Sequence, residues 1–436
     1  MEKGKAIGYA KNLVTYTSAS LIPMLLNLIA NPFIAKNMSP EDYAITGYFT
    51  SFNTLISPII IFYLIHYYTK SYFTLDEEGR LKLKATIFKA LIFFSFGIAM
   101  LCFIAIAVYM TASSASRQFP IFPYLLMTVF AIPLTGIYTL EQTDFKMQRK
   151  SRSFFRLSTI NGVSLVALNL ILIVALKWGA FGRLLAPLAI NLSMFIYLAV
   201  KHREYFRISF DYGYFKEILK FCLPLTASAM LGYFFNGFDK TYLESLGNVN
   251  EYGIYIVGAQ MAGFLTTFST AISATFQPDM YKAIAKNDNR QFLKVSGMTI
   301  GLVAITVAAF IIFAPFIVDI LTMGRYTAAA PYARILALST ITSTIYYATN
   351  NYTIAKGYPR LYLYTTIIGS ISMMALVPAA TARWEFNGAA AAVVLSYIIL
   401  TAVNFILLAI RRFFGCAQND KRGNDKKETF TEKMTE

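Results

Sequence analysis

The distribution of basic residues between long apolar segments is the feature that most constrains this chain. About twenty apolar residues cross a bilayer as a helix, and cutting the chain into twelve such spans places 31 of its 39 Lys and Arg residues beside one membrane face. The exceptions are Lys36, Arg117, Lys177, Arg183, Lys240, Arg325, Arg334 and Arg383. Because basic loops are retained in the cytoplasm, the pattern predicts an all-α polytopic membrane protein with twelve transmembrane helices and both termini cytoplasmic.

The composition agrees with a membrane protein and argues against a nucleic-acid partner. Hydrophobic residues make up 56% of the chain and charged residues 14%, with a mean hydropathy of +0.52. A soluble protein could not bury that much apolar surface. Basic loops lying against anionic lipid head groups account for the formal net charge of +16. Membrane lipids are therefore expected partners, and nucleic acid is not.

The apolar runs place the expected helices to within about 2 to 4 residues. The run over residues 13–34 is too long for a signal peptide and lacks a small-residue cleavage site, so it is expected to remain as the first helix. Residues 415–436 are charged and poor in apolar side chains, which predicts a disordered cytoplasmic tail. The expected spans cover residues 11–35, 44–70, 86–111, 118–140, 155–176, 180–200, 216–244, 251–277, 293–321, 328–352, 361–381 and 386–410.

Three weak internal matches predict that the chain consists of two related halves. Such repeats govern the whole architecture of a fold. We expect an N-terminal six-helix half over residues 1–211 and a C-terminal six-helix half over 212–414, related by a pseudo-symmetry axis along the membrane normal. Duplicated architectures of this kind place a substrate site between the halves. The matches align residues 41–45 with 250–254, Tyr72 with Tyr281, and Trp178 with Trp384.

Polar residues inside the apolar spans are candidates for a cavity lining, because they are costly in a bilayer unless they face the bundle interior or water. On the first span Asn27 and Asn31 share a polar face at helical period, and on the seventh Asn236, Asp239 and Lys240 share another. We expect these faces to form opposite walls of one central cavity. The alternative is hydrogen bonding between helices by small polar residues.

Asp239 and Lys240 are the most pointed charge feature inside a span. Ionisable residues in a membrane are functional candidates, but the two could also form a self-neutralised pair in which Lys240 reaches Glu244 as well. Arg183 lies just inside an outer helix end, where snorkelling to lipid head groups is the alternative explanation. The candidate substrate-binding residues are Asn27, Asn31, Arg183, Asn236, Asp239 and Lys240.

Other polar features are assigned structural roles. Glu141 and Asp144 end the fourth span beside five basic residues and are expected to form a solvated ion-pair cluster. His66 lies in a Tyr-rich helix end and is expected to be interfacial. Two His residues, no Cys and His cluster and no phosphate-binding Gly-rich loop with a Lys indicate no metal, no cofactor and no enzyme activity.

Two parts of the chain resemble a known family. Residues 239–243 (Asp-Lys-Thr-Tyr-Leu), followed by 253–255 (Gly-Ile-Tyr), resemble the signature of Wzx-type polysaccharide biosynthesis flippases between the seventh and eighth spans. Residues 356–359 (Lys-Gly-Tyr-Pro), through Trp384 to 388–390 (Gly-Ala-Ala), are similar to the closing part of the same family. The resemblance covers essentially the whole chain. It implies the multidrug/oligosaccharidyl-lipid/polysaccharide exporter superfamily.

The resemblance implies a flippase that moves an undecaprenyl-diphosphate-linked oligosaccharide repeat unit across the bacterial inner membrane by alternating access, for surface polysaccharide such as O-antigen. The implied partners are the lipid-linked oligosaccharide, a coupling ion (proton or sodium) and a polysaccharide polymerase. A multidrug exporter of the same superfamily is the first alternative. A major-facilitator carrier is the second, because residues 76–80 match the Asp-x-x-Gly-Arg motif of that family. A glycosyl polymerase would need a large outer loop, which is not expected here.

Overall fold

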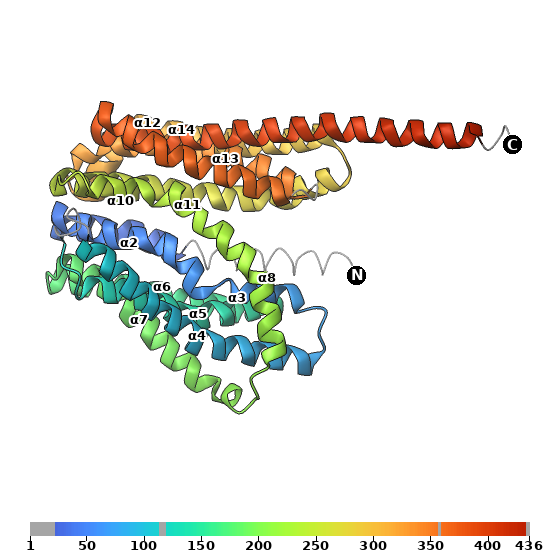
Figure 1. Ribbon diagram of the computed structural model, residues 1–436. Helices are drawn as coiled ribbons and strands as arrows, with labels where there is room; N and C mark the ends of the chain where they lie inside the picture. The colour runs from blue at the N-terminus through green and yellow to red at the C-terminus, as the bar shows by residue number, and fades with distance from the viewer. Residues whose placement is uncertain (1–21, 113–118, 356–358, 433–436) are drawn as a thin grey trace, which may run out of the picture.

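The chain folds into two helical bundles that lie side by side (Figure 1). The computed structural model describes residues 22–112, 119–355 and 359–432, and within these ranges every element is a helix. The elements are a helix over residues 22–37, α2 (Pro40–Ile61), α3 (Leu64–Ser71), α4 (Glu77–Ala112), α5 (Tyr124–Met147), α6 (Ser151–Asn169), the π-helical η2 (Leu170–Ala175), α7 (Gly179–Lys201), η3 (Arg203–Phe206), α8 (Tyr212–Leu231), α9 (Tyr233–Asn236), α10 (Phe238–Glu244), α11 (Val249–Ala285), α12 (Asn289–Thr322), η4 (Thr327–Ala329), α13 (Ala330–Ala355) and α14 (Pro359–Glu432).

Nine helices in the described ranges are long and apolar enough to cross a membrane. This confirms an all-helical, multi-pass membrane protein, and in the described ranges each expected span overlaps one or more helices. Three expected spans are not among the nine as separate helices. The first span is described only from residue 22, α13 is rich in Ser, Thr and Asn, and α14 holds the last two expected spans, which count as one. The total of twelve and the cytoplasmic termini stay predictions, and residues 1–21 lie outside the described ranges.

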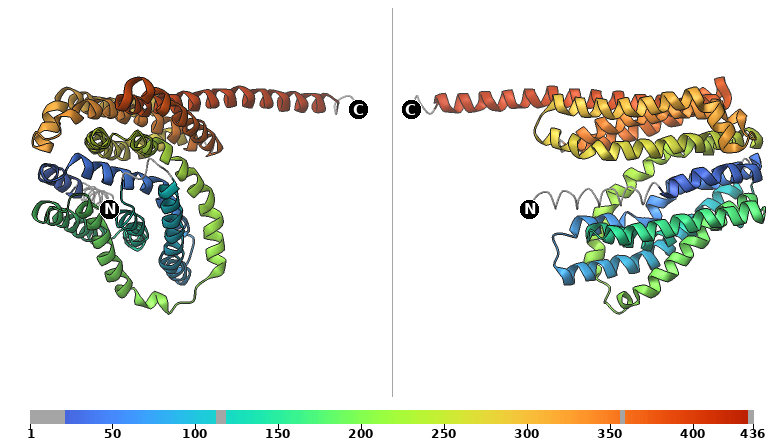
Figure 2. Two further views of the ribbon diagram at one scale, coloured as in Figure 1. Left: turned by 60° about the vertical axis from the view of Figure 1, so that its left-hand side comes forward. Right: turned by 180° about the vertical axis from the view of Figure 1, so that it is seen from behind.

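The helices group into an N bundle and a C bundle, and the expected division of the chain into two six-helix halves stays a prediction. In the N bundle, α2 to α7, helices α4 and α7 pack on α5. In the C bundle, α9 to α14, helices α11, α12 and α13 pack on one another and α14 packs on α13. Helix α8 connects the bundles, since it packs on α2, α3 and α4 and also on α14 (Figure 2). The exact division at residues 211 and 212 stays a prediction.

The second expected span, residues 44–70, is not one continuous helix. Phe62 and Tyr63 adopt left-handed backbone with φ of 50° and 51°, which separates α2 from α3. Side chains with a Cβ disfavour this region, so neighbouring groups must hold the break in place. The Tyr63 carbonyl accepts from the backbone N–H of His66 at 2.9 Å and from the Cys222 thiol of α8 at 3.3 Å. The break therefore depends on the contact between α3 and α8.

The seventh expected span, residues 216–244, is also interrupted. Gly232 and Gly237 divide it into α8, α9 and α10. Glycine carries no Cβ and loses more conformational entropy in a helix than other residues, which makes it a favoured place for a break. The boundary between the last two expected spans is borne out, because Trp384 and Glu385 have non-helical backbone within α14.

Apart from the connecting helix α8, the N and C bundles are joined by one shared hydrophobic core cluster. One core cluster runs from Tyr43 and Tyr48 of α2 to Tyr255 and Met261 of α11, at the end predicted to be extracellular. At the opposite end, the described residues form two separate clusters. One centres on α3, α4 and α8, and the other is a small group that includes Met280 and is confined to the C bundle. We call the joined end the closed end.

Two glycines allow α2 and α11 to approach closely at the closed end. A Cβ added at Gly253 would collide with the backbone of Pro40, and one added at Gly47 would collide with the Ile256 side chain. The same two helices carry the first pair of internal sequence matches, and the aligned Tyr43 and Tyr252 are both buried. Equivalent helices of the expected repeat therefore pack against each other.

Helix α14 continues through the segment expected to be a disordered tail. Its backbone is helical up to Glu432 and projects away from both bundles in Figure 1. A helix without tertiary packing has only its local propensity to stabilise it, and such helices are marginal in water. Disorder of residues 415–436 in solution therefore stays a prediction.

Candidate functional site

Three of the candidate residues come together where the seventh span is broken. Asp239 is 2% exposed, and its Oδ2 accepts from the Tyr255 hydroxyl of α11 at 2.7 Å. Lys240 Nζ lies 3.5 Å from Asp239 Oδ1 and donates to the backbone carbonyl of Asn236 at 2.9 Å. Lys240 thus turns back toward Asn236, and among the described carboxylates it pairs with Asp239 and not with Glu244. The structure thus has the Asp239–Lys240 pair of the alternative interpretation, but Lys240 donates to the Asn236 carbonyl and does not reach Glu244.

This cluster lies on the interface between the bundles. Thr241, the next residue on α10, has its Oγ1 3.2 Å from the Ser51 hydroxyl of α2. The Tyr233 hydroxyl donates to the same Thr241 oxygen at 2.7 Å. The side chain of Lys240 is partly exposed, whereas Asp239 is buried behind it. A cation that is accessible and anchored by a buried carboxylate can bind an anionic group without losing its partner.

Asn31 holds helices together and does not present its side chain to a cavity. It is 1% exposed, and its Nδ2 donates to the Leu321 carbonyl of α12 at 2.8 Å. Its Oδ1 accepts from Gln260 of α11 at 2.7 Å. In this conformation Asn31 therefore forms hydrogen bonds between helices, which was the alternative to lining a cavity. Asn27 is half-buried and donates to the Pro23 carbonyl of its own helix at 3.0 Å.

Arg183 lies apart from Lys240. It sits near the start of α7, where the backbone N–H of Ala180 donates to Asp42 Oδ1 at 2.8 Å, beside Tyr43 in the first turn of α2. Lys240 neighbours Thr241, which contacts α2 at Ser51. Tyr43 and Ser51 are separated by about 12 Å of helical rise. The two candidate cations therefore flank α2 at different depths and do not form one cluster.

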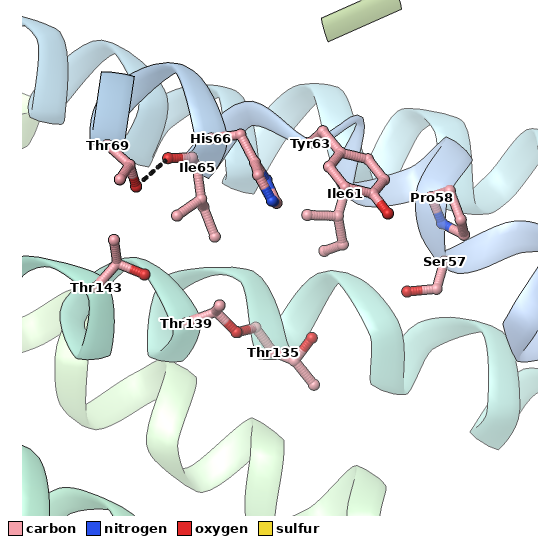
Figure 3. A pocket seen from close by; sticks show the side chains of 10 residues that line it. All are labelled: Ser57, Pro58, Ile61, Tyr63, Ile65, His66, Thr69, Thr135, Thr139 and Thr143. Atoms are coloured by element: carbon pink, nitrogen blue, oxygen red, sulfur yellow. Dashed lines mark hydrogen bonds between the residues drawn. The ribbon is translucent and has the colours of Figure 1, made fainter. Parts of the chain in front are cut away.

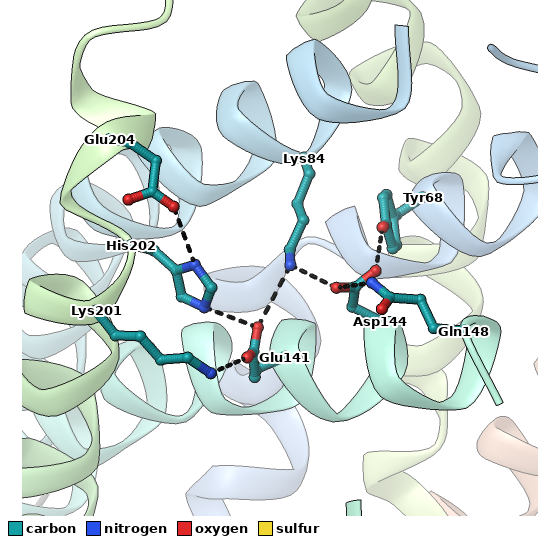
Figure 4. A network of polar contacts seen from close by, with 8 residues as sticks. All are labelled: Tyr68, Lys84, Glu141, Asp144, Gln148, Lys201, His202 and Glu204. Carbon is teal, nitrogen blue, oxygen red and sulfur yellow. Dashed lines mark hydrogen bonds and ion pairs between the residues drawn. The ribbon is translucent and has the colours of Figure 1, made fainter. Parts of the chain in front are cut away.

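A charge network around Glu141 and Asp144, whose burial and partners the sequence did not indicate, lies at the other end of the N bundle (Figure 4). Lys84 of α4 contacts two carboxylates of α5, Asp144 at 2.6 Å and Glu141 at 3.4 Å. Glu141 also pairs with Lys201 at 2.8 Å and lies 3.0 Å from His202 Nε2. The network joins α4, α5 and the end of α7.

The expectation that Glu141 and Asp144 form ion pairs is confirmed, but the expectation that the cluster is solvated is wrong. These side chains are 3% and 4% exposed, and their partners Lys84, Lys201 and His202 lie far away in the sequence. Asp144 also accepts from the Tyr68 hydroxyl at 2.6 Å. The basic residues next to Glu141 in the sequence suggested local pairing in water. The charges are instead satisfied by tertiary contacts, as buried charges must be.

A cavity of about 380 Å³ lies at the break between α2 and α3 (Figure 3). One wall comes from the break and α3, and the other from a stripe of threonines on α5 spaced four residues apart. That spacing on one helical face is a signal in the sequence that would have indicated a polar wall. The lining residues are Ser57, Pro58, Ile61, Tyr63, Ile65, His66, Thr69, Thr135, Thr139 and Thr143.

His66 lies in this cavity wall. It was expected at a membrane interface, and its side chain is exposed in the structure. Its ring lies 4.5 Å from the ring of Tyr63. Within the described ranges, no group of three or more His, Cys, Asp or Glu side chains is placed to hold a metal ion.

The family is decided by a match over most of the chain. The family model described as "Polysaccharide biosynthesis protein" matches residues 34–321. The chain belongs to the polysaccharide biosynthesis protein family. The matched residues include the breaks in the second and seventh expected spans, the Asp239–Lys240 pair and the cavity. These features therefore lie within the region that the family model describes. No curated protein sequence matches this chain significantly.

Solved structures show the same fold in flippases and drug transporters. The lipid II flippase MurJ in an inward closed conformation has a TM-score of 0.68 at 14% identity, with 91% of this chain and 87% of that chain covered. An inward-facing MATE family multidrug resistance transporter of the MOP superfamily has a TM-score of 0.65 at 15% identity, with 92% and 98% covered. A MATE transporter from Vibrio cholerae has a TM-score of 0.59 at 14% identity, with 94% and 98% covered. This polysaccharide biosynthesis protein therefore shares its fold with these transporters.

Proposed function

We propose that this protein is a flippase that moves an undecaprenyl-diphosphate-linked oligosaccharide repeat unit across the bacterial inner membrane, for assembly of a surface polysaccharide such as O-antigen. A proton or sodium gradient drives the cycle, and a polysaccharide polymerase receives the product. The family membership supports a role in polysaccharide biosynthesis. The fold supports transport, because the structures that share it are those of a lipid II flippase and of multidrug transporters.

The observation that carries the proposal is the one-ended packing of the two bundles. A single core cluster joins them at the closed end, whereas the clusters at the other end are separate. Alternating access in transporters built from repeats comes from rocking one bundle against the other around a site between them. Contacts concentrated at one end are those of a transporter closed on one side of the membrane.

The polar cluster at Lys240 supports the recognition of an anionic lipid. A lysine ammonium is a compact point charge that binds phosphate, and it interacts more strongly in a poorly solvated interface than in water. Lys240 and Asn236 would contact the diphosphate while the polyprenyl tail stays in lipid. Arg183, about 12 Å away along α2 by helical rise, would meet the lipid at a different stage of its passage.

The alternative function is multidrug export within the same superfamily. It is favoured by the MATE transporters among the matching structures. A drug exporter needs no lysine for a diphosphate and no link to glycan assembly. The match to MOP-superfamily structures gives no support to a major-facilitator carrier.

The proposal is tested by deleting the gene in its host and restoring it on a plasmid. We expect the deletion to abolish surface polysaccharide and to leave lipid-linked repeat units in the inner leaflet, with both effects reversed by the plasmid. Surface polysaccharide is measured by immunoblotting, and the lipid-linked intermediate by mass spectrometry of extracted lipids. Unchanged polysaccharide together with increased drug sensitivity would support the exporter instead.

A further inference from the structure

The cavity at the break between α2 and α3 has a chemistry different from that of the Lys240 cluster. None of the ten side chains that line it is Asp, Glu, Lys or Arg. Five are hydroxyl-bearing Ser or Thr residues, and Tyr63 and His66 add two rings with polar tips. A diphosphate would find no cation in this wall. An uncharged ligand rich in hydroxyl groups would find several hydrogen-bonding partners.

The threonine hydroxyls on α5 are oriented to accept hydrogen bonds. Thr135 donates to the Ile132 carbonyl at 2.7 Å, and Thr139 donates to the Thr135 carbonyl at 2.9 Å. On the opposite wall, Thr69 donates to the Ile65 carbonyl at 3.2 Å. A hydroxyl has one donor hydrogen and two acceptor lone pairs, so each of these oxygens can still accept from a ligand. Sugar hydroxyl groups supply such donors.

The two walls of the cavity are held together by the buried charge network beside it. Tyr68 and Asp144, joined by a 2.6 Å hydrogen bond, are the chain neighbours of the cavity residues Thr69 and Thr143. Successive residues on a helix point in different directions. The buried pair thus clamps α3 to α5, and the adjacent residues face the cavity (Figure 3).

We propose that this cavity is a glycan subsite, which binds one uncharged sugar ring of the lipid-linked oligosaccharide. A volume of about 380 Å³ is near the lower bound of small-molecule sites, so it suits one ring and not a whole repeat unit. The inference rests on the proposed flippase function and adds the part of the substrate that this cavity recognises.

The test compares two lipids bound to the purified full-length protein in detergent, measured by native mass spectrometry. One probe is bare undecaprenyl diphosphate. The other is the undecaprenyl-diphosphate-linked repeat unit extracted from host cells that lack the gene. The wild-type protein should bind the glycan-bearing lipid more tightly than the bare one. The Thr135→Val/Thr139→Val variant should bind the glycan-bearing lipid about tenfold more weakly, as expected for two lost hydrogen bonds, and the bare lipid unchanged.

Thr128→Val is the matched control. Thr128 lies on the same helix and makes the same kind of bond, donating to the Tyr124 carbonyl at 2.9 Å, but it does not line the cavity. It should bind both lipids as the wild type does. The single variant Thr139→Val, at an exposed position, should show a smaller loss of the same kind and guards against misfolding of the double variant.

The outcomes separate the two proposals. Valine variants that bind the glycan-bearing lipid as tightly as the wild type would overturn the glycan subsite. Equal binding of both lipids by the wild type would also overturn it, and would leave the flippase function standing. Failure of the wild type to bind either lipid would overturn the flippase function and the subsite with it.

Discussion

In the Asp239–Lys240 pair, Lys240 has an ion-pair partner and is still accessible to a ligand. Asp239 is buried, accepts a hydrogen bond from the Tyr255 hydroxyl and forms an ion pair with the Lys240 ammonium. Lys240 keeps part of its side chain exposed at the interface between the bundles. The buried carboxylate would orient the lysine, and a ligand phosphate would then add to existing contacts without displacing them.

Replacing Lys240 with Ala should therefore reduce export, and Lys240→Arg should retain more activity than Ala because the positive charge is kept. Loss of a hydrogen bond from a charged group costs about 1.5 to 3 kcal/mol, so we expect export to fall by roughly ten- to a hundredfold. Surface polysaccharide in the complemented deletion strain is the measurement, with protein abundance in the membrane checked by immunoblot.

Lys36→Ala is the control for Lys240, since Lys36 is an exposed lysine predicted at the same membrane face. It should export normally. Arg183→Ala should also reduce export if Arg183 contacts the substrate during passage. Normal export by both Lys240→Ala and Arg183→Ala would contradict the cationic recognition of the lipid. The residues would then be a neutralised pair and a head-group anchor.

At the scale of helices, the apolar runs predicted the spans well because burial in lipid imposes one length and one composition on each helix. The same runs could not show that Phe62 and Tyr63 break the second span, since these residues have no intrinsic preference for left-handed backbone. The burial of Glu141 and Asp144 was missed for a related reason. Their partner Lys84 comes from another helix, and pairing between helices leaves no local pattern.

The charge network provides a test of helix packing within the N bundle. Lys84→Met leaves Asp144 buried with hydrogen bonds but without its ammonium, and removing one partner of a buried ion pair destabilises by about 3 to 5 kcal/mol. The double variant Lys84→Met/Asp144→Asn should recover most of this loss, because neither charge is left alone. The stabilities of the single and the double variant are compared by thermal unfolding of the purified proteins in detergent.

Lys82→Met is the matched control on the same helix. Lys82 forms a salt bridge with Asp211 at 3.0 Å, but both side chains are accessible to water. Exposed pairs contribute little, so its unfolding temperature should match that of the wild type. Equal unfolding temperatures for Lys84→Met and Lys82→Met would show that the buried network does not stabilise the bundle.

At the scale of the whole molecule, the closed end is where two expected halves become one core. Gly47 and Gly253 permit contact between α2 and α11 that larger residues would prevent. Ser51 and Thr241 place a hydroxyl contact of 3.2 Å across the interface between α2 and α10. Opening this end must separate these groups, because the site between the bundles is otherwise closed to that side.

A disulfide between positions 51 and 241 should therefore stop transport. With the native Cys102 and Cys416 replaced by Ala and Cys222 by Ser, which keeps a donor for the Tyr63 carbonyl, we introduce Ser51→Cys and Thr241→Cys together. Their hydroxyl oxygens are close enough for the Cβ atoms to approach the separation of about 3.5 to 4.5 Å that a disulfide needs. Oxidation should hold the closed end shut and abolish flipping of the lipid-linked repeat unit in proteoliposomes, and a reductant should restore it. Each single cysteine variant should flip the lipid with or without oxidant, which controls for damage by the oxidant itself. Undiminished flipping by the fully cross-linked protein would mean that the substrate crosses without separation of α2 and α10, and the alternating-access mechanism would have to be abandoned for this chain.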